Sequence, residues 1–239
     1  MTQTFPYMLP PDLADLEAVS PALAHYTTDL LFGDAWKRTG LSPRDRSVAV
    51  VAALIARQQV VDMPVHFALA LDNGVTAAEL SEIITHLAFY AGWPNAMAAV
   101  RIARDAFAAA GVKAADLPSA RPDLLPIDEA AEVKRAAAVD ASAGPVSQGV
   151  VHYTAVALFK DVWLRPDLKP RDRSLVTVSA LIANGQVAQI PFHLNRAMDN
   201  GLTKDEASEV LTQLAFYAGW PCIFSAVPVF KAVFEGRKA

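Results

Sequence analysis

Residues 87–94 read LAFYAGWP, and residues 214–221 repeat the same eight letters. The repetition extends outward: LSPRDRS at 41–47 returns as LKPRDRS at 168–174, and DNG at 72–74 returns at 199–201. One constant offset of 127 residues aligns the range 25–107 with 152–234 and needs no gap. The chain therefore contains two copies of one unit, called copy one and copy two below, and each feature can be compared with its counterpart.

The repeated unit is predicted to be helical. The stretch 79–90, ELSEIITHLAFY, places apolar residues at the i, i+3, i+4, i+7 spacing of an amphipathic helix. Thr76 and Glu79 have the spacing of a capping box, so this helix should begin directly after the Asn73-Gly74 stop, and copy two repeats the pattern. Proline in a first turn predicts central helices near 43–57 and 170–184, and shorter helices should follow near 63–72 and 190–199. No stretch has a convincing strand pattern, so we expect an all-α fold.

The duplication divides the chain into three expected segments. Residues 1–111 form copy one and residues 145–239 form copy two. Residues 112–144 lie between them and comprise a proline-containing linker followed by an unmatched helix near 127–140.

Composition excludes several classes of protein. Hydrophobic residues make up 53% of the chain and charged residues 19%, which favours a packed core over disorder. A formal net charge of −4 offers no basic surface for nucleic acid or acidic membranes. The single cysteine excludes an intramolecular disulfide, and the amino-terminal residues lack the features of a signal peptide. We therefore expect a cytoplasmic protein with neither a nucleic-acid nor a membrane partner.

The polar side chains that can carry chemistry gather around a histidine present in both copies. Asp62 and His66 are four residues apart and share a helix face, while Gln59 lies across the preceding bend. A histidine paired with a carboxylate can act as a general acid or base near neutral pH. Two other interpretations stay open: Asp62 can be the N-cap of its helix, and the histidine can be a packing residue.

Copy two keeps the histidine but not the acid. The positions of Gln59, Asp62 and His66 are filled there by Gln186, Gln189 and His193. Because glutamine carries no charge, it cannot support an imidazolium as a carboxylate does. The two sites should therefore not be equivalent.

Arg46 and Arg173 occupy matching positions one turn into the two strongly apolar helices. A partly buried guanidinium needs a carboxylate, which can come from the protein as a structural ion pair or from a substrate. Asp45 and Asp172 precede these arginines directly and point elsewhere on a helix, so they are not the obvious partners. Structural and substrate-binding roles both remain open.

The repeated AGWP corner supplies aromatic candidates. Tyr90 and Trp93 lie at this corner in copy one, and Tyr217 and Trp220 lie at it in copy two. Aromatic residues at a helix end can pack into the core or line a ligand pocket. We take Tyr90 and Trp93 as candidate pocket residues.

Common catalytic and cofactor motifs are missing from the sequence. It has no GxGxxG or P-loop after a strand, no HExxH and no GxSxG. His66 and His193 also lack the neighbouring His, Cys or carboxylate set of a metal site. We expect neither a metal nor a cofactor.

The pattern LSPRDRS…NGVT..E…HLAFYAGWP resembles the carboxymuconolactone decarboxylase family, within the alkylhydroperoxidase D-like superfamily. The resemblance covers both copies and implies an all-α fold of two tandem helical repeats of this type. Members with a single repeat are commonly hexamers, so the resemblance implies that a tandem chain assembles as a trimer. It also places the active site near the short helix that carries the motif histidine.

The peroxidase branch of that superfamily uses a glutamate, a CxxC pair and a histidine. With its histidine aligned on His66, Ser47 stands at the glutamate, and Gln59 and Asp62 stand at the cysteines. Thiol peroxidase chemistry needs a thiolate, and Cys222 is not a counterpart. The resemblance therefore favours the thiol-free decarboxylase branch, where a carboxylate is often found four residues before the histidine.

These features predict a cofactor-free decarboxylase, or a related proton-transfer enzyme, for a small carboxylated lactone like γ-carboxymuconolactone in aromatic-acid catabolism. Arg46 would anchor a carboxylate, Gln59 would stabilise the lactone oxygen, and His66 with Asp62 would deliver the proton. The copy-two counterparts are Arg173, Gln186, Gln189 and His193. The alternative from another class is a non-catalytic small-molecule-binding or assembly protein on the same fold, which the missing acid in copy two favours.

Overall fold

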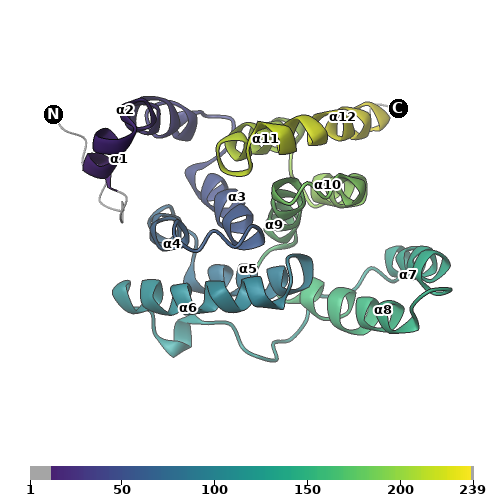
Figure 1. Cartoon of the computed structure of the whole chain (residues 1–239). Coiled ribbons are helices and arrows are strands. Elements are labelled where there is room, and N and C mark those ends of the chain that lie inside the picture. Colours follow the sequence, from purple (N-terminus) through teal and green to yellow (C-terminus); the bar gives the residue numbers. More distant parts are fainter. Residues whose placement is uncertain (1–11, 238–239) are drawn as a thin grey trace.

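The computed structural model describes residues 12–237, and within this range the chain forms helices and no strand (Figure 1). Copy one contains α1 (Leu13–Val19), α2 (Pro21–His25), α3 (Pro43–Ala56), α4 (Met63–Asp72), α5 (Ala77–Tyr90) and α6 (Trp93–Ala109). Helix α7 (Glu129–Ala143) lies between the copies in the sequence, and copy two contains α8 (Gln148–Tyr153), α9 (Pro170–Ala183), α10 (Ile190–Asp199), α11 (Lys204–Ala218) and α12 (Trp220–Gly236). The all-α prediction is confirmed. Across residues 12–237, no helix is long and apolar enough to cross a membrane.

The centre of the molecule is the pair α3 and α9, which pack against each other. Ser42 caps α3 by accepting a hydrogen bond from the backbone N–H of Asp45, and Pro43 fits the first turn. Every residue of α3 from position 45 to 56 is buried, as is every residue of α9 from 172 to 183. Helices that are apolar on all sides are stable only when surrounded, which explains their central place.

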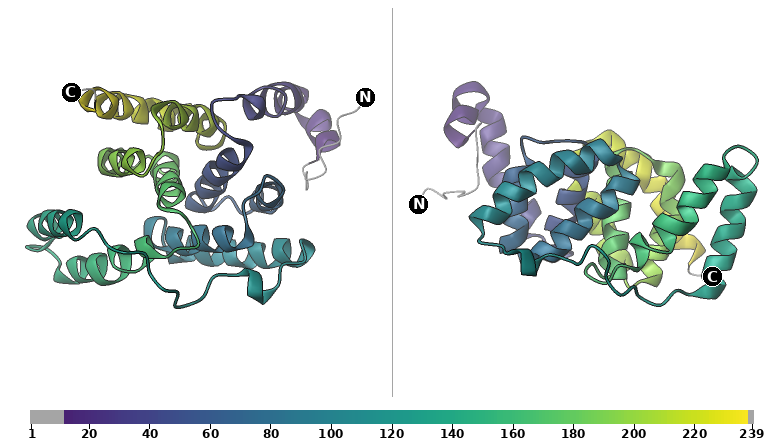
Figure 2. Two further views of the ribbon diagram at one scale, coloured as in Figure 1. Left: turned by 180° about the vertical axis from the view of Figure 1, so that it is seen from behind. Right: turned by 90° about the horizontal axis from the view of Figure 1, so that it is seen from below.

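The two copies interlock around this central pair. Helix α11 of copy two packs against α3 of copy one, and α5 of copy one packs against α9 of copy two. Figures 1 and 2 show α11 and α12 on one side of the central helices and α5 and α6 on the other. The end of each long outer helix therefore reaches the other copy.

The helix boundaries agree with the sequence patterns to within a few residues. Thr76 and Thr203 both form complete capping boxes with the glutamate three residues later. Gly74 and Gly201 have φ values of 90° and 101°, as expected for the residue that follows a helix stop. The unmatched helix expected near 127–140 is α7.

Two helical pairs extend from this core at opposite ends of the molecule (Figures 1 and 2). Helix α1 packs on α2, and α7 packs on α8. Each pair continues into a π-helical segment, residues 26–31 in copy one and 154–159 in copy two. The two π-helical segments lie beside the two histidine sites.

Candidate functional site

His66 is held between two aromatic side chains that come from different copies. The indole Nε1 of Trp36 donates a hydrogen bond of 2.9 Å to the hydroxyl of Tyr217. The Trp36 ring stacks on the His66 ring with centroids 6.0 Å apart, and Tyr217 meets His66 edge-on at 5.1 Å. Because Tyr217 lies in the last turn of α11 of copy two, the copy-one site is completed by the other copy.

Copy two repeats this trio with the contributions exchanged. Trp163 Nε1 donates to the Tyr90 hydroxyl at 2.9 Å. His193 stacks on Trp163 at 6.1 Å and meets Tyr90 edge-on at 5.2 Å. The predicted pocket residue Tyr90 therefore belongs to the His193 site and not to the His66 site.

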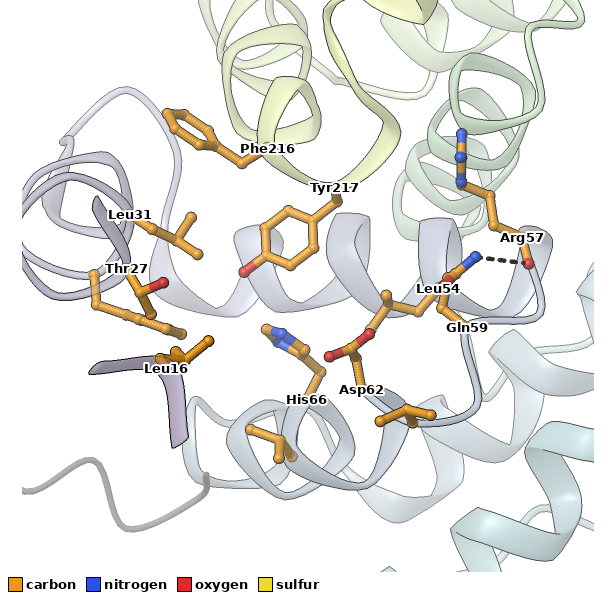
Figure 3. Close-up of a pocket in the computed structure, with 13 residues that line it drawn as sticks. Leu16, Thr27, Leu31, Leu54, Arg57, Gln59, Asp62, His66, Phe216 and Tyr217 are labelled. Atoms are coloured by element: carbon orange, nitrogen blue, oxygen red, sulfur yellow. Dashed lines mark hydrogen bonds between the residues drawn. The ribbon is translucent and has the colours of Figure 1, made fainter. Parts of the chain in front are cut away.

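A cavity of about 390 Å³ opens beside His66 (Figure 3), within the range of roughly 300–1,000 Å³ for small-molecule pockets. Seven of its thirteen lining residues are apolar, and the polar groups of Asp62, His66 and Tyr217 share the cavity. Gln59 also lines it, while its side-chain amide donates to the backbone oxygen of Arg57 at 3.2 Å. The other lining residues are Leu16, Thr27, Leu31, Phe32, Leu54, Arg57, Val61, Val65 and Phe216.

Asp62 occupies the N-cap position of α4, but its side chain makes no capping hydrogen bond. Its carboxylate and the His66 imidazole point into the same space below Tyr217 (Figure 3). Partial desolvation raises the pKa of Asp62 above its usual value of 3.8. Asp62 is therefore the N-cap residue by position, but its carboxylate does not cap the helix.

Burial sets the charge state of the groups around the cavity. His66 is only 7% exposed, and desolvation lowers its pKa to about 4, so the imidazole is neutral at pH 7 in the free protein. Its Nδ1 is buried and has no hydrogen-bond partner among the described residues. Burial, together with the charge of Asp62, raises the pKa of Tyr217, which keeps its proton.

The hydrogen bond between Trp36 and Tyr217 also fixes which way the tyrosine proton can point. An indole N–H only donates, so the Tyr217 oxygen must be the acceptor. The hydroxyl hydrogen is then left for another acceptor, and Tyr217 lines the cavity. This geometry provides a donor for an oxygen atom of a bound molecule.

Arg57 lines the cavity as well, although the sequence analysis assigned it no role. Its Nη1 donates to the backbone oxygens of Ala183 and Ala218, each at 3.0 Å. Figure 3 shows its guanidinium directed away from His66. The arginine joins the carboxyl ends of α9 and α11 to copy one and closes one end of the cavity.

Arg46 and Arg173 are structural, and their predicted substrate-binding role is wrong. Both are fully buried. Arg46 Nη2 pairs with Glu209 at 2.9 Å, and Arg173 Nη2 pairs with Glu82 at 2.9 Å. Neither arginine lines the cavity. The carboxylate that each requires comes from the protein, from the long outer helix of the opposite copy.

The remaining candidate residues lie outside the cavity beside His66. Trp93 is 59% exposed, packs edge-on against Phe89 and does not line the cavity beside His66. Gln186 and Gln189 are exposed near His193, at the positions of Gln59 and Asp62. Cys222 does not line the His66 cavity.

Trp36 and Tyr217 are not among the site residues predicted from the sequence. The repeat could have identified both residues, because Trp36 recurs as Trp163 and Tyr217 recurs as Tyr90 at the constant offset. One sequence cannot show that each tyrosine crosses to the histidine of the other copy. That exchange follows from the packing of α11 on α3.

Comparison with known proteins agrees with this architecture. A family model described as "Carboxymuconolactone decarboxylase family" matches residues 21–105 and 149–232. A 4-carboxymuconolactone decarboxylase from Acinetobacter baylyi is 39% identical over 75 residues, which cover 31% of this chain and 56% of that protein. The nitrosuccinic acid decarboxylase npaB from Metarhizium robertsii is 32% identical over 73 residues, which cover 30% and 51%.

The chain thus spans about half the length of the curated relatives it matches. The family match is broader, because its two segments take in both copies and most of the helices described above. On this ground, and with the tandem helical architecture on which the match falls, the chain belongs to the carboxymuconolactone decarboxylase family.

Proposed function

We propose that this chain is a cofactor-free decarboxylase that removes CO₂ from a small carboxylated lactone, γ-carboxymuconolactone or a close analogue, as a step in aromatic-acid catabolism. The observation that carries the proposal is the convergence of Asp62, His66 and Tyr217 on one cavity, where seven of the other ten lining residues are apolar. Family membership and the names of both relatives support decarboxylation as the reaction class.

The substrates named for the two relatives share a chemical property. In each, the carboxylate can leave from a carbon whose electron pair is stabilised, by a conjugated lactone in one and by a nitro group in the other. Breaking the carbon–carbon bond releases neutral CO₂ and moves its electron pair onto an oxygen of that group. The site must therefore stabilise negative charge on that oxygen.

Tyr217 is suited to this task. Its hydroxyl hydrogen can be donated to the oxygen on which charge develops, because Trp36 already occupies the tyrosine oxygen as donor. A hydrogen bond received by a hydroxyl also strengthens the bond that it donates. Tyr217 would stabilise the dienolate after CO₂ has left.

His66 would supply the proton that completes the reaction. It is neutral in the free protein, but a bound anionic substrate favours the imidazolium form, as does the carboxylate of Asp62. The proton then passes from the imidazolium to a carbon of the dienolate, which completes the replacement of CO₂ by hydrogen. Asp62 would hold the charged ring in place.

The apolar wall would promote the loss of CO₂ itself. Leu16, Leu31 and Phe216 lie on the same side of the cavity as Tyr217, away from Arg57 (Figure 3). A carboxylate held against such a wall loses hydration, while the neutral CO₂ does not need it. We therefore place the leaving carboxylate at this end.

The experiment that tests the proposal is an ultraviolet and CO₂-release assay with γ-carboxymuconolactone, and with nitrosuccinate as a second substrate. We expect turnover by the wild-type protein, and a loss of about 10²–10⁴-fold for His66→Ala without a change in helical circular dichroism. Folded wild-type protein that turns over neither compound would reject the proposal. Tight binding of either compound without turnover would favour the non-catalytic binding protein.

We also propose that the chain forms a homo-oligomer, a trimer as expected for a tandem form. Matching apolar side chains on α6 and α12 support this proposal: Trp93 and Met97 are 59% and 50% exposed, and Trp220 and Phe224 are 52% and 68% exposed. Exposed apolar groups of this size are typical of interfaces. Light scattering should give a multiple of the 25.6 kDa chain, and a monomer would contradict the proposal.

A further inference from the structure

The copy-two trio has two arginine side chains beside it that the copy-one trio lacks. Arg196 follows His193 by three residues on α10, and its Cζ lies 4.2 Å from the centroid of the Trp163 ring. The Cζ atoms of Arg196 and of Arg135, which belongs to α7, lie 5.5 and 4.3 Å from the centroid of Phe159. Copy one has Leu69 at the position of Arg196.

The charges of this cluster do not cancel. Glu132 binds Arg135 with both carboxylate oxygens, at 2.6 Å from Nε and 2.7 Å from Nη2. Arg196 forms no ion pair with any residue in the range 12–237. One acid and two guanidiniums leave a net charge of +1 beside the aromatic rings.

Four nitrogen atoms around these rings are buried without a partner in the described part of the chain: Arg135 Nη1, Arg196 Nε, His193 Nδ1 and the Nδ1 of His86, whose ring lies 5.1 Å from that of Trp163. A buried donor without an acceptor costs free energy, and more so when the group is charged. Burial also lowers the pKa of Arg196, and the nearby charge of Arg135 acts in the same direction. An anion beside these groups would remove both penalties.

We propose that copy two is a binding site for a small carboxylate, held by Arg196 and Arg135. A planar guanidinium matches the geometry of a carboxylate, and both guanidiniums are already fixed on aromatic faces. Phe192 is 49% exposed and packs edge-on against His193, so it offers an apolar surface for the rest of the ligand. The ligand class is a small monocarboxylic acid with an apolar body.

The chemistry of this site favours binding over loss of CO₂. Arginine stabilises the carboxylate of the ground state, whereas decarboxylation requires that this charge move away. Gln189 also replaces Asp62, which leaves His193 without an acid of its own. Burial and the charge of Arg196 together lower the pKa of His193 to about 4, so the imidazole stays neutral at pH 7. The inference stands independently of the activity proposed for copy one.

The test uses acetate as the probe on the full chain. Each indole N–H of the four tryptophans gives its own nuclear magnetic resonance signal, assigned with single Trp→Phe variants. We expect acetate to move the Trp163 signal in a saturable way, while acetamide, its neutral analogue, and equal concentrations of sodium chloride do not. Arg196→Leu, which installs the copy-one residue, should weaken acetate binding about tenfold or more.

A matched control removes an arginine elsewhere. Arg104 pairs with Asp105 on the surface with 77% of its side chain exposed, so Arg104→Leu changes the net charge equally and should leave acetate binding unchanged. The proposal is overturned if acetate moves only the Trp36 signal, or if both variants lose binding to the same extent. It is also overturned if the wild-type protein binds no acetate. A change of oligomeric state in Arg196→Leu would then show that Arg196 pairs with a carboxylate of a second chain.

Discussion

The two copies build the same trio of tryptophan, tyrosine and histidine and then surround it with opposite charge. In copy one, Asp62 faces the histidine and Leu69 stands where copy two has a cation. In copy two, Gln189 replaces the acid and Arg196 stacks on the tryptophan. The trio is common to both copies, and the chemistry proposed for copy one therefore rests on a few positions at its edge.

The exchange of tyrosines explains why the trio itself is the same in both copies. Tyr217 completes the site of His66, and Tyr90 completes the site of His193. Each copy thus carries a residue that the other one needs. Positions 62 and 69 and their counterparts lie outside this exchange, so a substitution there alters one site and leaves the other intact.

The largest effect should come from removing each histidine in turn. His66→Ala should reduce turnover by about 10²–10⁴-fold, because the reaction loses its positioned proton donor. His193→Ala should keep turnover within about twofold of wild type, since no step of the proposed reaction uses it. Steady-state rates on γ-carboxymuconolactone check both values. Equal losses in the two variants would mean that the sites are not divided in the proposed way.

The buried ion pairs provide the next comparison. Arg46→Met and Arg173→Met should each destabilise the fold by about 3–5 kcal/mol, because a buried carboxylate loses one of its partners. Arg46→Met should cost more, since Gln213 also loses the donor that Arg46 provides at 2.8 Å. Urea unfolding measures both. The exposed Arg104→Met serves as the control and should cost less than about 0.5 kcal/mol.

Both histidines should make the stability of the fold depend on pH in the acid range. Both are neutral in the folded protein, with pKa values lowered from 6.5 to about 4 by desolvation. A lowered pKa means that the unfolded chain binds the proton first, so stability is complete above pH 6.5 and is lost as the pH falls toward 4. Each histidine should account for on the order of 2 kcal/mol of this loss.

The measurement is the unfolding free energy at several pH values. His66→Gln and His193→Gln should each flatten the profile between pH 6.5 and 4 by a similar amount, and the double variant should flatten it further. Carboxylates that titrate in the same range remain in every variant and cancel in the difference. A profile that the double variant leaves unchanged would show that the histidines are already charged in the folded protein.

Much of this fold was accessible from the sequence because local rules agree with the global packing. The capping boxes at Thr76 and Thr203 and the glycine stops after each short helix lie where the spacing predicted them. The central helices could be recognised because they are apolar on all sides. Local sequence therefore determined the elements and their ends.

The site was accessible only in part, because it depends on contacts between distant residues. Asp62 and His66 could be grouped by helical spacing, and Gln59 could be added because it lies just across the preceding bend. The partner of Arg46 could not be found this way, because Glu209 comes from the opposite copy. The same reason hid the role of Tyr217. Contacts between residues of different copies leave no spacing pattern in the sequence.

The smallest effect should come from the tyrosine hydroxyls, and it tests the exchange between copies most directly. Tyr217→Phe keeps the ring against His66 but removes the donor to the developing oxyanion, so turnover should fall by about tenfold or more. Tyr90→Phe is the matched control, because it removes the same hydroxyl and the same bond from tryptophan at the other site. Its rate should stay close to wild type.

The two variants should lose similar stability, since each leaves one indole N–H without its acceptor. A difference in rate with equal stability therefore reports on chemistry and not on packing. If Tyr90→Phe lowered turnover and Tyr217→Phe did not, the reacting site would be that of His193. The tyrosine in copy one would then complete the active site in copy two, the reverse of the division proposed from the charges.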